Sequence, residues 1–345
     1  MTIQKINIER FLKLSETIKI ADVRSPSEFS FGHVPGAVNI PLFDDKEREA
    51  VGIKYIKEGR LSAIIEGLKH SAPALVSKLE QGLKIAENGK LLVHCWRGGM
   101  RSEAMAWLFS LGDLEVNVLD GGYKAYRRYL LESLSEKRKM IVLGGMTGSS
   151  KTHILRYLKS SGQQIIDLER LANHKGSAFG ALGEPPQPTT EHFGNLLFND
   201  FRKLNTSLPF WVEDESRNIG SVFMPDTFYL NMQETPTIVL IMSVNSRLPR
   251  LMEEYSVYPS EFLITSLLKI SKRLGGDKTR DAIDAVEKGD FAKAIEIVLY
   301  YYDKTYLFGL QKKDANSIIY VNAGTDDIES NALKILEASK TIIWT

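Results

Sequence analysis

Cys95 is the only cysteine in the 345 residues of the chain. A lone thiol excludes an intramolecular disulfide, including one to a resolving cysteine, so a chalcogen atom carried on this sulfur must leave to another molecule. Long apolar runs are also lacking. None approaches the roughly 18 residues that a membrane-spanning helix needs, and residues 1–7 have no apolar core of signal-peptide length. We therefore expect a cytoplasmic protein without a membrane segment.

An excess of either charge is lacking too, because 44 lysines and arginines face 43 aspartates and glutamates, for a formal net charge of +1. This balance neither indicates nor excludes a nucleic-acid partner, since a local basic face can be offset elsewhere. The hydrophobic fraction of 43% and the charged fraction of 25% are those of an ordinary globular protein. At about 100–200 residues per domain, the length predicts two domains.

Cys95 lies on a predicted strand-to-helix loop. The apolar residues 90–93 before it are typical of a buried strand, and residues 102–108 after it are typical of a helix. Backbone N–H groups of such a loop and the positive end of the helix favour an anion, and Arg97 and Arg101 add full charges. We therefore predict a partly ionised thiol, with Cys95, Arg97 and Arg101 as catalytic residues. A buried cysteine that serves as a small apolar side chain is the alternative, which the two arginines and two glycines of the loop disfavour.

Four separated motifs follow one another in residues 1–130. They are Asp22-Val23-Arg24 with Glu28-Phe29, then Gly32-His33-Val34-Pro35-Gly36-Ala37, then the Cys95 loop, and then Gly121-Gly122-Tyr123. This order resembles that of the rhodanese domain, and the short strands that alternate with helices favour a parallel sheet. The resemblance implies that Cys95 carries the chalcogen and that Arg97 and Arg101 bind an anionic donor. It also implies that Asp22 and Arg24 are structural or orient the donor.

The spacing from Cys95 to Arg101, followed by Ser102, is also that of the anion loop of cysteine-dependent phosphatases. In those loops a thiolate attacks phosphorus while the arginine holds phosphoryl oxygens. The rhodanese-like surroundings, and the lack of an aspartate placed as a general acid, make a phosphatase the weaker interpretation. A loop suited to a tetrahedral oxyanion that carries a chalcogen satisfies both patterns.

A second strand-loop-helix pattern begins at residue 139. Residues 139–143 form an apolar strand pattern, and Gly145-x4-Ser150-Lys151-Thr152 matches a phosphate-binding P-loop except that Ser150 replaces the last glycine. Small residues let backbone N–H groups wrap a phosphate, while the lysine reaches terminal phosphoryl oxygens and the threonine holds Mg²⁺. The predicted phosphate-binding residues are Gly145, Thr147, Gly148, Ser149, Ser150, Lys151 and Thr152. Thr152 is also the candidate Mg²⁺ ligand.

These patterns predict an α/β fold class, with an N-terminal rhodanese-like parallel-sheet domain followed by a P-loop NTPase-like α/β domain. We place the domains at residues 1–130 and 139–345, the second with a C-terminal helical part, and a basic linker helix at residues 131–138. Arg127 and Arg128, just before the linker, are candidate RNA contacts. The interleaved tyrosines are available in that interpretation for stacking on bases, and a solvated helix explains the charges equally well. These tyrosines are Tyr123, Tyr126 and Tyr129.

Further polar residues of the second domain are candidate substrate or RNA contacts. They are His174, Lys175, Glu215, Arg217 and a predicted helix with Lys269, Lys272 and Arg273. Each can equally be a surface residue, and a hydrogen-bonded structural histidine explains His174 as well as catalysis does. The acid cluster 213–215 can supply a carboxylate to Mg²⁺ or water, or can be a capped strand end with exposed charge.

Three more motifs extend the pattern through the second domain. They are His174-Lys175-Gly176-Ser177-Ala178-Phe179-Gly180, Gln187-Pro188-Thr189 and Glu215-Ser216-Arg217-Asn218-Ile219-Gly220. A rhodanese-like domain followed by a P-loop domain with these motifs closely resembles the bacterial tRNA 2-selenouridine synthase family over nearly the whole chain. The resemblance implies a transferase that converts the wobble 2-thiouridine of tRNA to 2-selenouridine through an S-geranylated intermediate. The implied partners are tRNA, geranyl diphosphate and selenophosphate, with no tightly bound cofactor besides the candidate Mg²⁺.

Two steps of that chemistry divide between the two loops. We expect Lys151 to serve chiefly geranylation, by stabilising the departing diphosphate, and Cys95 to serve only selenation, by accepting selenium as a selenyl-sulfide. Two alternatives remain. A persulfide sulfurtransferase coupled to a nucleotide-hydrolysing P-loop domain would turn over ATP without a prenyl diphosphate. A binding module would hold tRNA or a nucleotide and carry out no chemistry on either donor.

Overall fold

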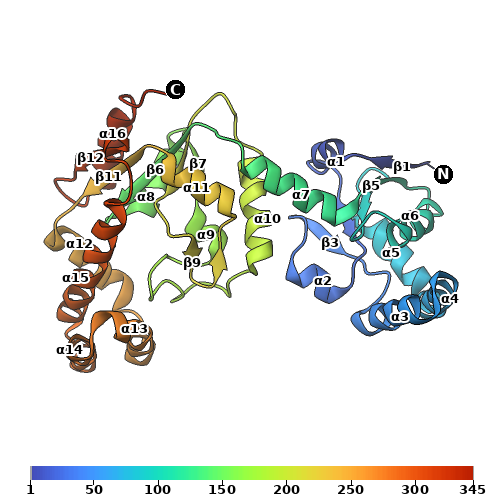
Figure 1. Cartoon of the computed structure of the whole chain (residues 1–345), viewed down its shortest axis with the longest axis horizontal. Helices are drawn as coiled ribbons and strands as arrows, with labels where there is room; N and C mark the ends of the chain where they lie inside the picture. Colours follow the sequence, from blue (N-terminus) through green and yellow to red (C-terminus); the bar gives the residue numbers. More distant parts are fainter. Residues whose placement is uncertain (1, 345) are drawn as a thin grey trace. The chain divides into compact units, whose positions relative to one another are not determined.

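The computed structural model describes residues 2–344 and forms two compact units, which we call the N-terminal unit (residues 1–133) and the C-terminal unit (residues 134–345) (Figure 1). A parallel five-stranded sheet lies at the centre of each unit. The predicted fold class, two successive parallel-sheet α/β domains, is thereby confirmed. Among the described residues, no helix combines the length and the apolar character needed to cross a membrane.

The sheet of the N-terminal unit has the strand order β1-β5-β4-β2-β3. Its strands are β1 (Thr2–Ile6), β2 (Ile20–Asp22), β3 (Ala37–Asn39), β4 (Lys90–His94) and β5 (Glu115–Leu119). Its helices are α1 (Ile8–Leu14), α2 (Pro26–Phe31), α3 (Asp45–Glu58), α4 (Arg60–Ser71), α5 (Leu75–Ile85), α6 (Met100–Ser110) and α7 (Gly122–Leu134). The connections after β2 and β4 lead toward opposite edges of the sheet. In open parallel sheets, the carboxyl ends of two strands at such a reversal are the usual position of a ligand site.

Strand β4 passes through the core of this unit and ends at the predicted thiol loop. Leu91 and Val93 have no exposed surface and pack in one apolar cluster with Phe109 of α6. A strand covered on both faces carries a continuous apolar run instead of an alternating one, and for this reason residues 90–93 could be identified from the sequence. Because its residues are buried, β4 has a fixed position in the sheet. The residue that follows it, Cys95, is therefore held at the carboxyl end of the strand.

A buried ion pair closes the carboxyl end of β2. The Arg24 guanidinium donates to Asp22 at 2.6 Å and to the Gly32 carbonyl at 2.7 Å, and its central carbon lies 3.8 Å from the centre of the Tyr123 ring. Burial alone would raise the pKa of Asp22, but the neighbouring His94 and Arg24 more than offset it and lower that pKa. The side chains of Asp22 and Arg24 therefore bind other groups of the protein. This supports a structural role for the two residues over a role in orienting the donor.

The sheet of the C-terminal unit has the strand order β12-β11-β6-β8-β7. Its strands are β6 (Met140–Gly145), β7 (Gln164–Ile166), β8 (Phe210–Glu213), β11 (Thr237–Ile241) and β12 (Ile318–Asn322), and a separate antiparallel pair consists of β9 (Asn218–Ile219) and β10 (Val222–Phe223). The connections after β6 and β11 lead to opposite sides of the sheet, so a crevice opens outside the carboxyl ends of these neighbours. The P-loop follows β6 at this crevice.

Nine further α-helices, α8 to α16, belong to the described part of the C-terminal unit. Figure 1 shows their arrangement. They are α8 (Lys151–Ser160), α9 (Leu168–Ala172), α10 (Thr190–Phe201), α11 (Asp226–Glu234), α12 (Val244–Tyr255), α13 (Ser260–Leu274), α14 (Gly276–Glu287), α15 (Phe291–Leu310) and α16 (Ile328–Ser339). Helices α13, α14 and α15 pack around an apolar cluster of their own, which includes Leu267, Val286 and Val298. The sheet core is separate and contains the buried Trp211.

The edge strand β1 has no counterpart among the predicted elements, and the linker differs from its prediction. Residues 2–6 contain no continuous apolar run, but β1 pairs with β5, and only the last of its five residues is buried. An edge strand of this kind carries no apolar signal. The helix predicted over residues 131–138 ends at Leu134, and the chain then extends toward β6. Lys137 and Arg138 there form ion pairs with Glu234 and Glu136.

We predict that Gly122→Ala destabilises the protein by more than about 2 kcal/mol. Gly122 has φ +58°, and a Cβ at this position would lie 2.4 Å from the Cys95 carbonyl oxygen. Gly36 is the matched control, because its φ is +87° and a Cβ there would meet nothing within 4 Å. Gly36→Ala should cost only the backbone penalty of about 1 kcal/mol. The measurement is the free energy of unfolding in urea, and equal losses for the two variants would contradict the crowding at Gly122.

Candidate functional site

The Cys95 thiol lies at the floor of the loop between β4 and α6. Its side chain is 3% exposed, and its Sγ lies 3.3 Å from the Ser102 Oγ in the first turn of α6. Burial alone would raise the pKa of the Cys95 thiol. The Ser102 hydroxyl, the Arg101 charge and the Arg97 amide outweigh burial and lower that pKa below its ordinary value. The loop therefore stabilises a thiolate, as the sequence predicted.

The two predicted arginines differ in their surroundings. Arg97 is exposed. Arg101 is half-buried, and its guanidinium donates to the two carboxylate oxygens of Glu28 at 2.7 and 3.5 Å. Glu28 also accepts from the Ser25 backbone N–H at 3.1 Å, which fixes the carboxylate at the start of α2. Arg101 is thus oriented by the Glu28 of the first motif, a link that the sequence did not reveal.

The start of α7 holds the thiol loop from outside. The backbone N–H groups of Tyr123 and Lys124 donate to the carbonyl oxygens of Cys95 and Trp96 at 2.8 and 3.0 Å. The C=O and the following N–H of one peptide unit point in opposite directions, so these bonds turn the next amides, including that of Arg97, away from α7. The Gly121-Gly122-Tyr123 motif therefore positions the amides that stabilise the thiolate.

The P-loop lies between β6 and α8 and lines a cavity of about 1090 Å³. All seven predicted phosphate-binding residues line this cavity. Lys151 Nζ donates to the Gly145 carbonyl at 3.0 Å, and Thr152 Oγ1 donates to Glu169 at 2.7 Å. The structure thus brings the loop, its lysine and its threonine together at the crevice of the sheet.

Ser150 takes the backbone conformation that usually calls for glycine at this position of a P-loop. Its φ is +63°, in the left-handed region, which is strained by roughly 1–3 kcal/mol for a residue with a side chain. Its hydroxyl donates to Asp326 at 2.7 Å, and Arg250 of α12 donates to the same carboxylate at 2.6 Å. The serine is therefore tied to the segment after β12, and its side chain is directed to a protein partner.

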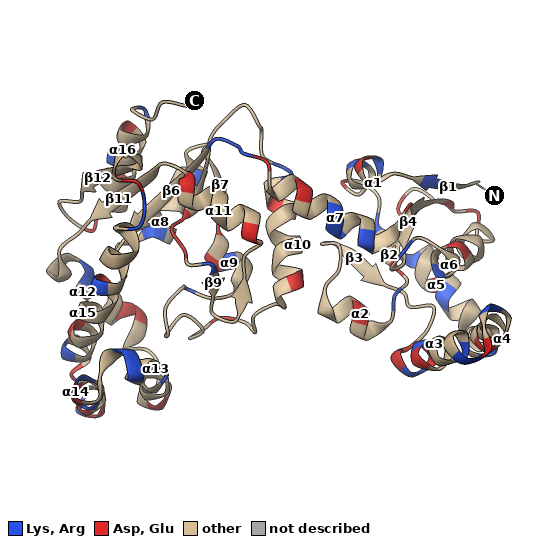
Figure 2. Cartoon of the chain, viewed as in Figure 1, with Lys and Arg blue, Asp and Glu red and all other residues tan. Residues whose placement is uncertain are grey.

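The carboxylates of Glu169 and Glu215 interact with the Lys151 charge near the end of β8, in a region where Figure 2 shows acidic residues between α8 and α9. Burial, with the charge of the neighbouring Glu169, raises the pKa of Glu215 to about 8, although Lys151 acts in the opposite direction. Burial also raises the pKa of Glu169. Glu213 has no exposed surface, so the alternative of an exposed, capped strand end is wrong for this residue. Glu215 and Glu169 both line the P-loop cavity.

The other predicted contacts of the C-terminal unit separate into two groups. Lys175 lines the P-loop cavity, where its ammonium group lies 2.8 Å from Glu254, and Arg273 lines the same cavity. His174 is only 8% exposed, and its ring fills the space beside Gly180. Arg217 is exposed and forms an ion pair with Asp226 at 2.5 Å. Neither His174 nor Arg217 lines the cavity.

The basic face of α7 differs from the RNA-stacking interpretation. Tyr123 is 0% and Tyr126 1% exposed, and both rings pack in the core of the N-terminal unit. Of the two interpretations left open by the sequence, the one in which these rings stack on bases is therefore wrong. Arg128 is exposed and lies 3.9 Å from Glu132, and Arg127 is half-buried. The tyrosines recur every third residue, and this spacing places them on one face of the helix, which here is the inner one.

Helices α12 and α15 hold the P-loop from outside, through residues that the sequence did not single out. Arg247 is 1% exposed and donates to the Thr147 carbonyl at 2.8 Å. The same guanidinium forms a two-point ion pair with Asp303 at 2.6 and 2.9 Å. With its carbonyl held in this way, the Thr147 peptide unit turns the Gly148 N–H away from Arg247.

Tyr306 holds the other end of the loop. Its hydroxyl accepts from the Gly145 N–H at 2.8 Å and donates to Asp214 at 3.1 Å, and Lys313 donates to Asp214 at 2.8 Å. Burial and the Asp214 charge keep the pKa of Tyr306 above its ordinary value, so the phenol remains a donor. No short motif could have predicted these contacts, because the partners are far apart in the sequence.

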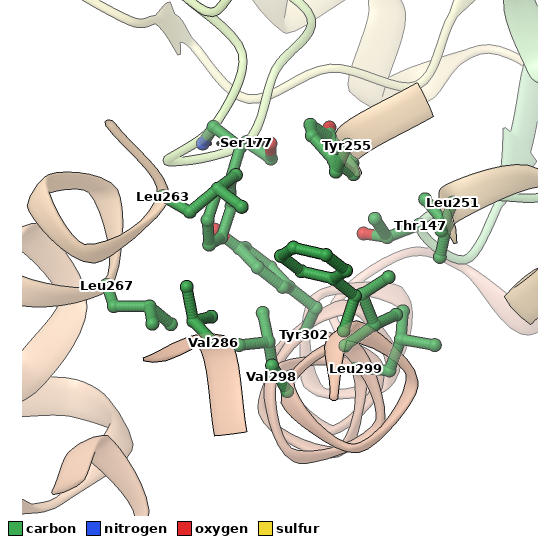
Figure 3. Close-up of a pocket in the computed structure, with 14 residues that line it drawn as sticks. Thr147, Ser177, Leu251, Tyr255, Leu263, Leu267, Val286, Val298, Leu299 and Tyr302 are labelled. Atoms are coloured by element: carbon green, nitrogen blue, oxygen red, sulfur yellow. Dashed lines mark hydrogen bonds between the residues drawn. The ribbon is translucent and has the colours of Figure 1, made fainter. Parts of the chain in front are cut away.

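An apolar cavity of about 50 Å³ adjoins the P-loop in the helical part of the C-terminal unit (Figure 3). Side chains from α12, α13, α14 and α15 point toward it, among them Leu263, Leu267, Val286 and Val298. Five residues line both this cavity and the P-loop cavity: Thr147, Ser177, Leu251, Tyr255 and Tyr302. The α15 contribution recurs every three or four residues from 291 to 302, a helical stripe that in the sequence is indistinguishable from an ordinary core face.

Two family models match the chain. Residues 138–332 match the model described as "tRNA 2-selenouridine synthase AAA domain", and residues 7–129 match the model described as "Rhodanese-like domain". Each matched range contains one of the two loops described above. The rhodanese-like match contains Cys95, and the match to the AAA domain contains the P-loop.

The chain is also similar along most of its length to proteins named tRNA 2-selenouridine synthase. It is 33% identical to the one from Nitrosomonas europaea, with 86% of this chain and 90% of that protein covered. It is 35% identical to the one from Bdellovibrio bacteriovorus, with 91% and 94% covered. It is 35% identical to the one from a Sulfurovum species, with 88% and 92% covered.

We predict that Ser102→Ala raises the pKa of the Cys95 thiol, because the variant loses the hydroxyl that stabilises the thiolate. The pH titration of thiolate absorbance near 240 nm measures this pKa directly, because the chain has one cysteine. Ser110→Ala is the control, since the Ser110 hydroxyl lies on the same helix and donates to the Trp107 carbonyl at 2.8 Å. A titration midpoint that is the same in wild type and Ser102→Ala would contradict the assignment.

Proposed function

The chain belongs to the tRNA 2-selenouridine synthase family, and from that membership we propose that it converts wobble 2-thiouridine of tRNA to 2-selenouridine through an S-geranylated intermediate. Geranyl diphosphate and selenophosphate are the co-substrates in this proposal. The observation that carries it is the contact between a P-loop cavity and an apolar cavity with shared lining residues. An amphiphile with a diphosphate head and a hydrocarbon tail needs such a pair of cavities.

The apolar cavity supports a prenyl chain as the tail. At roughly 10–15 Å³ for each water molecule, its volume of about 50 Å³ has room for about four water-sized groups, close to the bulk of one isoprene unit. The outer isoprene unit would occupy this space. The allylic carbon would then lie at the shared wall near Thr147 and Tyr302, next to the loop that holds the diphosphate.

Geranylation in this site is an allylic substitution. The thiocarbonyl sulfur of the base attacks the allylic carbon, the carbon–oxygen bond breaks, and its electron pair leaves with diphosphate while the base loses its N3 proton to solvent. Lys151 and the amide of Gly148 would stabilise the charge that develops on the departing diphosphate. These groups are held in place before the reaction, so they add no reorganisation at the transition state.

A Mg²⁺ ion would fit this site through the Thr152 hydroxyl and the Glu169 carboxylate, which lie 2.7 Å apart and line the P-loop cavity. Among the described residues, no group of three or more histidine, cysteine, aspartate or glutamate side chains could hold a metal ion. Mg²⁺ at phosphate sites is bound by one or two protein groups together with phosphate oxygens and water, so these two residues suffice. The ion would neutralise diphosphate charge.

Selenation belongs to the Cys95 loop in this proposal. Its thiolate-stabilising amides and Arg101 suit selenophosphate, an anionic donor of selenium. Selenium then replaces sulfur at C2 of the geranylated base, and geranylthiol leaves. The geranyl group makes this possible, because it converts a thiocarbonyl sulfur, a poor leaving group, into a thioether sulfur.

We predict that the two loops can be inactivated separately. Lys151→Ala should lower the rate of tRNA geranylation by about 10²–10³, because it removes one preorganised donor to the departing charge. Cys95→Ser should leave geranylation intact and abolish selenation. Mass spectrometry of thiolated tRNA after incubation with geranyl diphosphate, and of geranylated tRNA after incubation with selenophosphate, measures the two steps. A total loss of geranylation in Cys95→Ser would refute this division of labour.

We predict that Ala294→Leu raises the KM for geranyl diphosphate at least about tenfold, because the added methyl groups occupy the apolar cavity and exclude apolar surface of the substrate. Ala285→Leu is the control. Ala285 is 4% and Ala294 5% exposed, and both belong to the same apolar cluster, but only Ala294 lines the cavity. Inhibition by inorganic diphosphate should be the same in both variants. Equal increases of KM in the two variants would count against the cavity as the prenyl site.

A further inference from the structure

The proposed function leaves open which atom of selenophosphate the Cys95 thiolate attacks. The segment Cys95-x5-Arg101-Ser102 has the spacing of a loop in which a thiolate attacks phosphorus. In such a loop the arginine holds the phosphoryl oxygens, so its position relative to the thiol matters. Glu28 fixes it, with an ion pair of 2.7 Å between Arg101 and that carboxylate.

Electron balance distinguishes two ways in which a thiolate can react with selenophosphate. Selenium in selenophosphate is already at the oxidation level of selenide. Attack of sulfur on selenium would form a selenyl-sulfide, and the electron pair of the broken bond would leave phosphorus at the phosphite level or require an oxidant. Attack of sulfur on phosphorus changes no oxidation level, because selenium leaves with the bonding pair. The lone cysteine of the chain also offers no second thiol to discharge a selenyl-sulfide.

We propose that the Cys95 thiolate attacks the phosphorus of selenophosphate and releases selenide, and this rests on selenophosphate being the donor in the proposed function. A sulfur–phosphorus bond forms and the phosphorus–selenium bond breaks. Hydrogen selenide anion then attacks C2 of the geranylated base and expels geranylthiol. Water hydrolyses the S-phosphocysteine to phosphate and regenerates the thiol. The sum consumes selenophosphate, geranylated base and water, and yields selenated base, geranylthiol and phosphate.

The loop contains the groups that this attack needs. Arginine has five N–H donors, and the contacts of Arg101 with Glu28 use two of them, so the remainder are available to phosphoryl oxygens. The amide of Arg97 already stabilises the charge on Sγ. The Ser102 hydroxyl, 3.3 Å from Sγ, would stabilise the thiolate again when water displaces it from phosphorus.

The leaving group explains why the loop has no partner acid. Phosphatases that cleave an alkoxide from phosphorus need a general acid, because an alkoxide is strongly basic. Selenide is a far weaker base than an alkoxide and leaves as the anion at neutral pH. Asp22, the carboxylate of the first motif, is held by Arg24 with an N–O distance of 2.6 Å and is not positioned as a proton donor. A loop with phosphatase spacing and no general acid therefore suits selenophosphate better than a phosphate ester.

The experiment incubates the full chain with selenophosphate labelled with ³²P, without tRNA, followed by an alkaline denaturing quench. Phosphorus on the Cys95 peptide is measured by its radioactivity, and selenium on the same peptide by elemental mass spectrometry. We expect phosphorus without selenium on Cys95, release of selenide to solution, and no label in Cys95→Ser. Selenium without phosphorus on Cys95 would overturn the proposal. So would conversion of geranylated tRNA at full rate while neither element is ever found on Cys95.

Two arginine variants test the geometry. Arg101→Met should slow the formation of labelled protein by about 10²–10³, because it removes the donors to the phosphoryl oxygens. Arg48→Met is the matched control, since Arg48 also contacts Glu28, at 3.4 Å, but lies outside the loop and is 52% exposed. The control should be labelled at the wild-type rate. Equal slowing in both variants would assign the effect to Glu28 and contradict a role of Arg101 in phosphoryl binding.

The outcomes separate this inference from the proposed function. Labelled Cys95 with no conversion of geranylated tRNA would support attack on phosphorus and sink the proposed function. Selenated tRNA with unlabelled Cys95 would support the proposed function and sink the attack on phosphorus.

Discussion

In each unit a loop suited to bind an anion follows a central strand of a parallel sheet: the thiol loop in the N-terminal unit and the P-loop in the C-terminal unit. Hydrogen bonds to the carbonyl oxygens of each loop hold its peptide groups in place. The start of α7 holds the carbonyls of Cys95 and Trp96, and Arg247 holds that of Thr147. Each such bond turns the next N–H to the opposite side, where an anion can accept it. The chemistry proposed for both sites would depend on this arrangement, because a flexible loop would have to reorganise during the reaction.

Helix α15 connects the polar and apolar halves of the C-terminal site. Its first half lines the apolar cavity, and Asp303 and Tyr306 of its second half hold the P-loop through Arg247 and directly at Gly145. In the proposed function, a rigid helix that contacts both parts would fix the distance between the hydrocarbon tail and the diphosphate head of the substrate. In the N-terminal unit, Glu28 has the comparable position, since it joins the start of α2 to Arg101 of the thiol loop.

The buried strands and both loops could be predicted from the sequence, because their signals are local. A strand covered on both faces is a continuous apolar run, and each loop combines glycines with cations at a fixed spacing. The contacts that hold the loops could not be predicted from the sequence, because their partners are far apart in the chain. Arg247 is 100 residues from Thr147, and Glu28 is 73 residues from Arg101. The apolar cavity was also missed, because its α15 stripe has the period of any core-facing helix. The sequence also left open whether the tyrosines of α7 are buried or available to RNA, since period alone does not tell the inner face of a helix from the outer one.

The central claim is that two anion loops in separate units carry out successive transfers on one tRNA base. Mass spectrometry of thiolated tRNA tests it most directly, with the full chain supplied first with geranyl diphosphate and then with selenophosphate. The account predicts a gain of one geranyl group in the first stage and its loss, with selenium in place of sulfur, in the second. No change of mass at either stage would contradict it.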